Sequence, residues 1–302
     1  MNGSRVRIAR AFAPGHVTGV FRPDVSHRDP RGRGSVGAGV VLELGVTAVA
    51  AYVPGTRPRV RVVGDGPGPW PISEEVARRM ATRLSGAVTV HLTHGLPVGQ
   101  GFGTSAAGAL ATGLTVGALA GRSRAEAVQV AHLADLFGGG GLGGVSSILG
   151  GGLEVRVRPG VPPFGRIRHH PFRPALLVGV VGKPIPSASV LNDPIALHRI
   201  TRASDGWELL GDHPSVEQFF RVSERFTDRA GLSSPAVIRA VRALRHRGAW
   251  AGQAMFGESF FALPRTPAAR AKCLDWLRGE GLRAVELRAA TSGARRVRPP
   301  PR

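Results

Sequence analysis

Residues 97–110 read Pro-Val-Gly-Gln-Gly-Phe-Gly-Thr-Ser-Ala-Ala-Gly-Ala-Leu, and this stretch decides how the rest of the chain is interpreted. Glycine recurs at every second position from 99 to 103, so the backbone can turn tightly and bring its N–H groups against a ligand. The hydroxyls of Thr104 and Ser105 open a run of small residues, 106–120, that predicts a closely packed helix. Because the first turn of a helix has unpaired N–H donors and a partial positive charge, the stretch predicts a phosphate site.

Other glycine-rich motifs fit this loop less well. No lysine follows the glycines, as it does in a P-loop, and the glycine spacing differs from that of the dinucleotide fingerprint. Residues 87–93 alternate apolar and polar side chains, which predicts the strand that leads into the loop. A tight strand-to-helix turn that binds no ligand is the alternative interpretation.

Three stretches together resemble the GHMP kinases, the small-molecule kinases named for galactose, homoserine, mevalonate and phosphomevalonate. Residues 97–107 are similar to their ATP-phosphate motif. Residues 13–21, Ala-Pro-Gly-His-Val-Thr-Gly-Val-Phe, resemble the N-terminal motif of the archaeal-type pantoate kinases, and residues 252–259, Gly-Gln-Ala-Met-Phe-Gly-Glu-Ser, resemble their C-terminal motif. The three lie in the family's order across nearly the whole chain, so together they are far more specific than any one of them.

The resemblance implies an α+β fold in two domains, with a ribosomal S5 domain 2-like N-terminal domain and a ferredoxin-like C-terminal domain. The order of expected strands and helices also favours an α+β fold, because it lacks strict βαβ alternation. We expect an ATP-binding GHMP kinase domain at residues 1–172 and a C-terminal GHMP kinase domain at 173–292. The prolines and arginines of residues 293–302 predict a disordered basic tail.

The remaining elements follow from periodicity and capping residues. Ser123 and Glu126 form a capping box at the start of an amphipathic helix. Apolar alternation and short apolar runs predict strands at 5–13, 35–53, 60–63, 153–158, 176–181, 260–263 and 282–289. Helices are expected at 73–84, 123–136, 193–210, 215–230, 234–247 and 266–280, and we read 14–21 as a turn, 22–34 as a mobile loop, 37–39 as a turn or bulge and 159–171 as a connection.

The resemblance also assigns roles to individual residues. His16 and Thr18 become the catalytic candidates, placed to touch and orient the substrate with nearby arginines, and Lys183 lies in a loop that resembles one near the substrate. Ser105 and Asp135 are implied to hold Mg²⁺, which prefers oxygen ligands. The ATP-binding residues implied are Pro97, Gly99, Gly101, Gly103, Thr104, Ser105, Ala106, Ala107 and Gly257. The structural alternatives are a satisfied loop histidine at 16 and a surface aspartate at 135.

Position 144 departs from the family pattern. Relatives read roughly Thr-Gly-Leu-Gly-Asp-Val before a Gly-Gly-Leu-Glu-Val strand, whereas residues 140–145 here read Gly-Gly-Leu-Gly-Gly-Val. The aspartate that lines up with Gly144 is the catalytic residue of mevalonate-type relatives. Because phosphoryl transfer depends mostly on alignment and charge neutralisation, activity stays the leading hypothesis. A catalytically impaired relative is the second.

Composition limits the remaining function classes. The single cysteine, Cys273, excludes a disulfide framework within the chain, and we expect a cytoplasmic protein without a membrane span. The net charge of +20 could attract nucleic acid, but only two of the 40 basic residues are lysines and the arginines are scattered. We therefore interpret the charge as a compositional bias and do not expect nucleic-acid binding.

The function that the resemblance implies is ATP-dependent phosphorylation of pantoate to 4-phosphopantoate in coenzyme A biosynthesis, with ATP and Mg²⁺ as cofactors. The alternatives are a GHMP kinase acting on another small hydroxy compound, a nucleotide- or metabolite-binding protein without turnover, and a nucleic-acid-binding protein on the same scaffold. Dimers are common in the family and among soluble proteins, so a homodimer is one arrangement that the chain could adopt.

Overall fold

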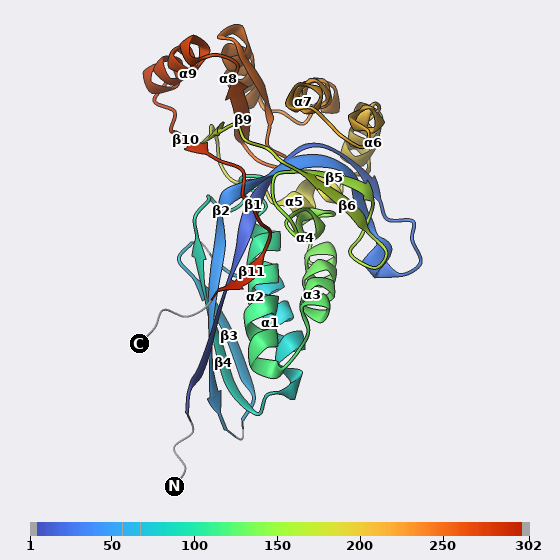
Figure 1. Cartoon of the computed structure of the whole chain (residues 1–302), viewed down its shortest axis with the longest axis vertical. Coiled ribbons are helices and arrows are strands. Elements are labelled where there is room, and N and C mark those ends of the chain that lie inside the picture. Colours follow the sequence, from blue (N-terminus) through green and yellow to red (C-terminus); the bar gives the residue numbers. More distant parts are fainter. Residues whose placement is uncertain (1–4, 56, 67, 298–302) are drawn as a thin grey trace.

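A computed structural model describes residues 5–55, 57–66 and 68–297 of the chain, which form two sheets with helices packed against each (Figure 1). The first sheet has the order β11-β1-β2-β4-β3, and β5 and β6 extend it from β2. Its strands are β1 (Arg7–Asp24), β2 (Gly34–Pro54), β3 (Arg59–Gly64), β4 (Gly86–His94), β5 (Leu153–Arg158), β6 (Arg166–His170) and β11 (Arg295–Val297).

The length of β2 places two different strands on one of its edges. Its second half, Val46–Pro54, pairs antiparallel with β4, which leads into the glycine loop. Its first half, from Gly37 to Val40, pairs antiparallel with β5. Because β1 runs along the other edge of β2 throughout, side chains of β1 and β5 can meet across β2.

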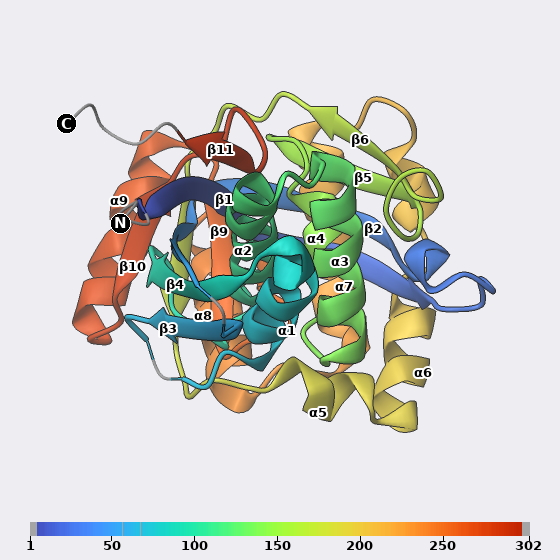
Figure 2. The same ribbon diagram turned by 90° about the horizontal axis from the view of Figure 1, so that it is seen from below.

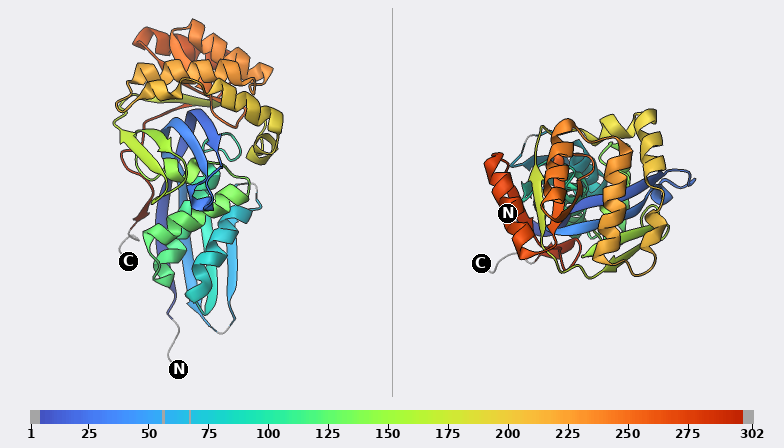
Figure 3. Two further views of the ribbon diagram at one scale, coloured as in Figure 1. Left: turned by 90° about the vertical axis from the view of Figure 1, so that its right-hand side faces the viewer. Right: turned by 90° about the horizontal axis from the view of Figure 1, so that it is seen from above.

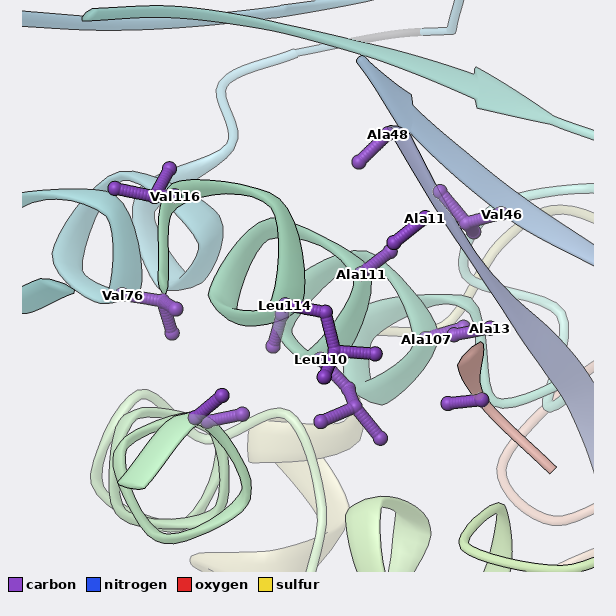
Figure 4. Close-up of a cluster of buried hydrophobic side chains, with 14 of the residues drawn as sticks. Ala11, Ala13, Val46, Ala48, Val76, Ala107, Leu110, Ala111, Leu114 and Val116 are labelled. Atoms are coloured by element: carbon purple, nitrogen blue, oxygen red, sulfur yellow. The ribbon is translucent and has the colours of Figure 1, made fainter. Parts of the chain in front are cut away.

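Helix α2 (Thr104–Ala120) is the centre of the first half of the molecule. It packs against the first sheet beside α1 (Pro71–Met80) and α3 (Arg124–Phe137), with the short α4 (Gly144–Ser147) near the end of α3 (Figure 2). Ala107 and Ala111 of α2 lie toward Ala11 and Ala48 of the sheet (Figure 4). Small side chains on both surfaces let the helix approach the sheet closely, so α2 is buried along most of its length.

The second sheet has the antiparallel order β10-β7-β9-β8. Its strands are β7 (Leu176–Val180), β8 (Ala249–Gln253), β9 (Ser259–Pro264) and β10 (Ala284–Leu287). The helices of this half are α5 (Ser187–Leu191), α6 (Pro194–Ala203), α7 (Val216–Ala230), α8 (Pro235–His246) and α9 (Pro267–Gly279). The longer ones, α6 to α9, form the upper layer in the left view of Figure 3. With α9 between β9 and β10, the sheet has the βαββαβ plan expected for a ferredoxin-like domain.

Alternating side chains on the second sheet serve two separate cores. Phe260 and Ala262 of β9 belong to a cluster with residues of α8 and α9. Phe261 and Leu263 point to the opposite face and join a larger cluster that contains Phe219 of α7 and residues of β1 and β2. This second cluster packs the two halves of the molecule together.

The expected turn at residues 14–21 is wrong, because these residues continue β1 up to Asp24. The pairing with β2 has two register irregularities. Between Pro14 and Gly15, residues 43 and 44 of β2 have no partner in β1, and between Thr18 and Val20, Gly19 of β1 has no partner in β2. Bulges of this kind re-aim neighbouring side chains, and they occur near functional sites. Residues 37–39 lie within β2 and are neither a turn nor the bulged segment, because the extra residue of the second irregularity lies opposite them in β1.

Two further expectations need correction. The connection expected at 159–171 contains β6, which pairs with β5. Of the tail expected to be disordered, residues 295–297 form β11 along the edge of β1, where the Arg295 guanidinium lies 5.1 Å from the centre of the Phe12 ring. An edge strand offers unpaired backbone groups to any segment that reaches it, whatever that segment's composition. Residues 298–302 lie outside the described part of the chain.

Among the described residues, no helix combines the length and apolar character that a membrane crossing requires. The apolar run at 36–53 lies inside β2, as expected for a strand.

Candidate active site

The glycine loop has the geometry that its sequence predicts. It connects β4 to α2, and Gly99, Gly101 and Gly103 all have positive φ angles, of 71°, 74° and 67°. Other residues adopt this left-handed conformation only at a cost. Gly103 is the N-cap of α2, so the loop ends directly on the first turn of a buried helix. The local geometry is therefore that of an anion site.

The second half of the molecule holds the loop in place. The Ser259 hydroxyl donates a hydrogen bond of 2.6 Å to the backbone carbonyl oxygen of Gln100. The side-chain amide of Gln100 donates one of 2.9 Å to the backbone carbonyl of Gly182. A β-carbon on Gly257 would lie 2.2 Å from the Gln100 carbonyl. Gly257 therefore packs behind the loop, where only a glycine fits.

Two adjoining cavities meet beside the first turn of α2. The first, of about 740 Å³, is lined by His16, Thr18, Phe21, Ser35, Gly99, Gly101, Gly103, Thr104, Ser105, Ala106, Asp135, Gly140, Gly141, Leu142, Gly143, Gly144, Arg156, Ser187, Met255 and Phe256. The second, of about 880 Å³, shares Gly99, Thr104, Ser105, Gly140 and Ser187 with the first. The shared wall is thus the phosphate loop and the start of the helix.

Most of the residues expected from sequence lie on these walls, and four do not. Ala107 is fully buried in the core beneath the loop, while Pro97 is exposed at its start. Gly257 lies behind the loop, and neither cavity has any of these three in its lining. Lys183, another candidate, is exposed and lines neither cavity.

Ser105 and Asp135 meet in the first cavity. The Ser105 hydroxyl donates a hydrogen bond of 2.9 Å to Oδ1 of Asp135, which is 3% exposed at the end of α3. Burial raises the pKa of Asp135 to about 7, and the bond from Ser105 opposes this only in part. A β-carbon on Gly140 would lie 2.0 Å from the same oxygen, so a glycine there leaves room for the carboxylate.

This pair fits a magnesium ion. It offers two hard oxygen atoms. Because no basic side chain of the described residues pairs with the buried carboxylate, a cation that neutralises it would stabilise it. Within the described ranges no cluster of three or more His, Cys, Asp or Glu side chains could hold a metal by itself. Mg²⁺ does not need one, because it is usually held by one or two carboxylates together with waters and substrate phosphates.

His16 is part of a buried polar group that the sequence did not reveal. Its Nε2 lies 2.9 Å from Oε1 of Glu154 on β5, and the same oxygen accepts a hydrogen bond from Nη1 of Arg156. Arg156 also donates a bond of 2.7 Å to the Ser147 hydroxyl. Burial lowers the pKa of His16, although the hydrogen bond to Glu154 opposes this effect. Thr18 is 3.4 Å away, with its Oγ1 toward Nδ1 of His16.

The second cavity has an aromatic wall. The Trp70 ring stacks on the His94 ring with centroids 4.6 Å apart, and Nδ1 of His94 lies 2.8 Å from Asp65. Apolar side chains of Ile72, Val98 and Ile185 line the rest of this wall. Apart from Val98, which lies in the glycine loop, no motif in the sequence marked these residues, because they come from the end of β4, the start of α1 and separate loops.

Gly144 lies at the start of α4, on the wall of the first cavity. A β-carbon at this position would be 2.6 Å from the Ala106 β-carbon and 3.7 Å from Oδ2 of Asp135. The backbone therefore leaves little space for the aspartate that the family pattern has here.

Comparisons with known proteins identify the family of the chain. A family model described as "GHMP kinases N terminal domain" matches residues 72–152. The chain is 31% identical over 265 residues to a protein named pantoate kinase from Thermococcus kodakarensis, covering 85% of this chain and 88% of that protein. A protein of the same name from Methanospirillum hungatei is 29% identical over 257 residues, covering 84% of this chain and 86% of the relative.

A solved structure described as a "Phosphotransferase related to CoA biosynthesis pathway" has a TM-score of 0.86 and 30% identity to this chain. The match covers 97% of this chain and 99% of that one. The chain therefore shares the fold of this structure over nearly its whole length and the sequence of the pantoate kinases over most of it, and it belongs to the GHMP kinases, within the family of the pantoate kinases.

Proposed function

We propose that this protein transfers the γ-phosphoryl group of ATP to the hydroxyl group of pantoate, giving 4-phosphopantoate for coenzyme A biosynthesis. The observation that carries the proposal is the 31% identity to a pantoate kinase over 85% of the chain. The glycine loop, its helix and the two cavities supply the local chemistry that a kinase needs.

The cavities suggest how the nucleotide lies. The triphosphate fits along the glycine loop, where Gly99, Gly101 and Gly103 turn the backbone toward the first turn of α2. The nucleoside fits the second cavity, because a flat apolar base can stack against the Trp70 ring. In this arrangement the γ-phosphoryl group points into the first cavity.

Ser105 and Asp135 would hold Mg²⁺ beside the phosphates. When bound, the ion neutralises charge on the β- and γ-phosphoryl oxygens. The carboxyl group of Asp135 must lose its proton to serve as a ligand, and a pKa of about 7 makes that loss inexpensive near neutral pH.

Arg156 is the candidate for the carboxylate of pantoate. It is a guanidinium on the wall of the first cavity, it is buried, and its Nε has no hydrogen-bond partner among the described residues. Guanidinium groups match carboxylates in shape and charge. Thr18, with a hydroxyl on the same wall, is the candidate for orienting the rest of the acid.

The test is ADP release with Mg²⁺, ATP and each of four acceptors: pantoate, mevalonate, homoserine and shikimate. We expect turnover with pantoate, detection of phosphopantoate by mass spectrometry, and loss of turnover in Asp135→Ala. Asp275→Ala on α9, where the side chain is 67% exposed, is the matched control and should behave as the wild type. Binding of ATP without ADP release for any acceptor would instead favour a nucleotide-binding protein without turnover. ADP release with one of the other three acceptors and not with pantoate would make that acceptor the substrate.

A further inference from the structure

Glu154 decides which nitrogen of His16 carries the proton. Its carboxylate can only accept hydrogen bonds while it is ionised, and it lies 2.9 Å from Nε2 of His16. Burial by itself would raise the pKa of Glu154, but Arg156 and His16 together lower it below its ordinary value. With an ionised Glu154, the neutral imidazole carries its proton on Nε2, and Nδ1 has the lone pair, to which the Thr18 hydroxyl at 3.4 Å can donate.

The contact between His16 and Glu154 depends on the missing side chain of Gly39 in β2, the strand that lies between β1 and β5. Thr18 of β1 and Glu154 of β5 both pair with Gly39 of β2, one on each side. A β-carbon on Gly39 would lie 2.2 Å from Nε2 and 2.5 Å from Cε1 of His16. The imidazole therefore crosses β2 through the space that Gly39 leaves open.

The same histidine is fixed to the phosphate loop. Its backbone N–H donates a hydrogen bond of 3.0 Å to the carbonyl of Phe102, and a β-carbon on Gly103 would lie 3.3 Å from the His16 β-carbon. Nδ1 is on the side of Thr18, at a weak contact distance of 3.4 Å, and both residues line the first cavity. The Nδ1 lone pair is thus held beside the loop where the phosphates would bind.

We propose that Nδ1 of His16 is the proton acceptor for the substrate hydroxyl group, and that Glu154 is the positioning residue that presents it. The inference rests on the proposed function. As the hydroxyl oxygen forms its bond to the γ-phosphorus, the bond from that phosphorus to the β-bridging oxygen breaks and ADP leaves with the electron pair. The hydroxyl proton moves to Nδ1, and the resulting imidazolium is stabilised by the Glu154 carboxylate until the proton passes to solvent.

The surroundings of His16 suit this task. The titratable and charged groups facing it are Glu154 and Arg156 from β5 and His169 from β6, with Asp135 of α3 on the same cavity. Burial and the cation of Arg156 keep the imidazole neutral at pH 7, so it can accept a proton. A histidine in this position supplies the base that glycine cannot supply at position 144.

The first test is nitrogen NMR of the histidine side chains in the free protein at pH 7.5, with His16 assigned by its absence in His16→Gln or by through-bond correlation. We expect the Nε2–H tautomer, with protonation only well below pH 6.5. In Gly39→Ala and Glu154→Gln the preference for that tautomer should weaken. A predominant Nδ1–H tautomer or a charged ring at pH 7.5 would overturn the inference, and this result does not depend on turnover.

The second test is the pH dependence of kcat with pantoate. His16→Gln should lower kcat by about 10²- to 10⁴-fold and remove the acid limb of the profile. Glu154→Gln should lower kcat by about 10-fold or more and move that limb to lower pH, because the imidazolium loses its partner. His246→Gln, an exposed histidine on α8, should stay within about twofold of the wild type and is the control.

Each outcome separates the two proposals. A wild type that makes no phosphopantoate refutes the proposed function. A wild type that is active while His16→Gln keeps its kcat within about threefold, or keeps the acid limb, refutes the role of His16 and leaves the proposed function standing.

Discussion

Replacing Gly101 with alanine tests whether the phosphate loop is clamped by the second half of the molecule. Gly101 has a φ of +74°, and its β-carbon would lie 2.5 Å from the carbonyl oxygen of Ala254 and 3.0 Å from the carbonyl carbon of Met255. Gly121, just beyond the other end of α2, has a similar φ of +67° and has nothing within 4 Å of such a carbon. The two substitutions therefore share the backbone strain and differ in the clash.

The magnitudes follow from this difference. The left-handed conformation costs an alanine about 1 kcal/mol at either position. Overpacking against a fixed backbone adds about 1–3 kcal/mol at Gly101 alone. We expect Gly101→Ala to lower the free energy of unfolding by about 2–4 kcal/mol and Gly121→Ala by about 1 kcal/mol. Because the clash also moves the loop, the ATP dissociation constant should rise about tenfold or more only in Gly101→Ala.

Urea unfolding followed by circular dichroism measures the first quantity, and calorimetric titration with ATP measures the second. Equal losses of stability in the two variants, together with unchanged ATP affinity in Gly101→Ala, would show that Ala254 does not clamp the loop. A weaker ATP affinity in Gly121→Ala as well would mean that strain anywhere along α2 reaches the loop.

Three further predictions concern the cavities. In metal-free buffer, the raised pKa of Asp135, about 7 against an ordinary 3.8, means that the folded protein holds this proton more tightly than the unfolded chain does. The protonated Asp135 stabilises the folded protein fully below pH 3.8, and this stabilisation is lost as the pH rises through 7. The free energy of unfolding of Asp135→Asn, measured with urea, should therefore rise relative to that of the wild type by about 2–3 kcal/mol from pH 5 to pH 8. A difference between the two proteins that does not change with pH would contradict the raised pKa of Asp135. Trp70→Ala should raise the KM for ATP about five- to tenfold with little change in kcat, whereas Trp70→Phe keeps the stacking and should lie near the wild type in steady-state assays. Gly144→Asp should not raise kcat above that of the wild type, because its β-carbon would lie 2.6 Å from that of Ala106, and Gly144→Ala measures the effect of that contact alone; a tenfold gain in Gly144→Asp would show that the missing carboxylate limits the natural enzyme.

Features set by neighbouring residues could be predicted from the sequence. The capping box at the start of α3 is present atom for atom: Ser123 Oγ accepts a hydrogen bond of 3.1 Å from the Glu126 amide, and Glu126 accepts one of 2.8 Å from the Ser123 amide. The glycine loop is equally local, because alternate glycines are required wherever alternate residues have positive φ. The meeting of Ser105 and Asp135 needed the family resemblance, since 30 residues separate them.

Features set by strand pairing could not be predicted. In Leu153-Glu-Val-Arg the alternation suggests an apolar face and a solvated one, yet all four residues are buried. Glu154 and Arg156 face the site because β5 pairs with the first half of β2, 115 residues earlier for the pair Gly39 and Glu154. The signal that could have found them is the glycine at position 39, where the missing side chain lets the His16 ring cross β2.

The absence of a carboxylate at position 144 and the presence of the His16–Glu154 pair are connected by charge. A carboxylate at 144 would stand near Asp135, whose burial already raises its pKa to about 7, and a second negative charge would raise it further. That would weaken the same oxygen ligand that a cation needs. Glu154 instead lies behind His16, where Arg156 balances its charge, and it reaches the cavity only through a neutral ring. The cation site and the base can therefore both be in their working protonation states at the same pH.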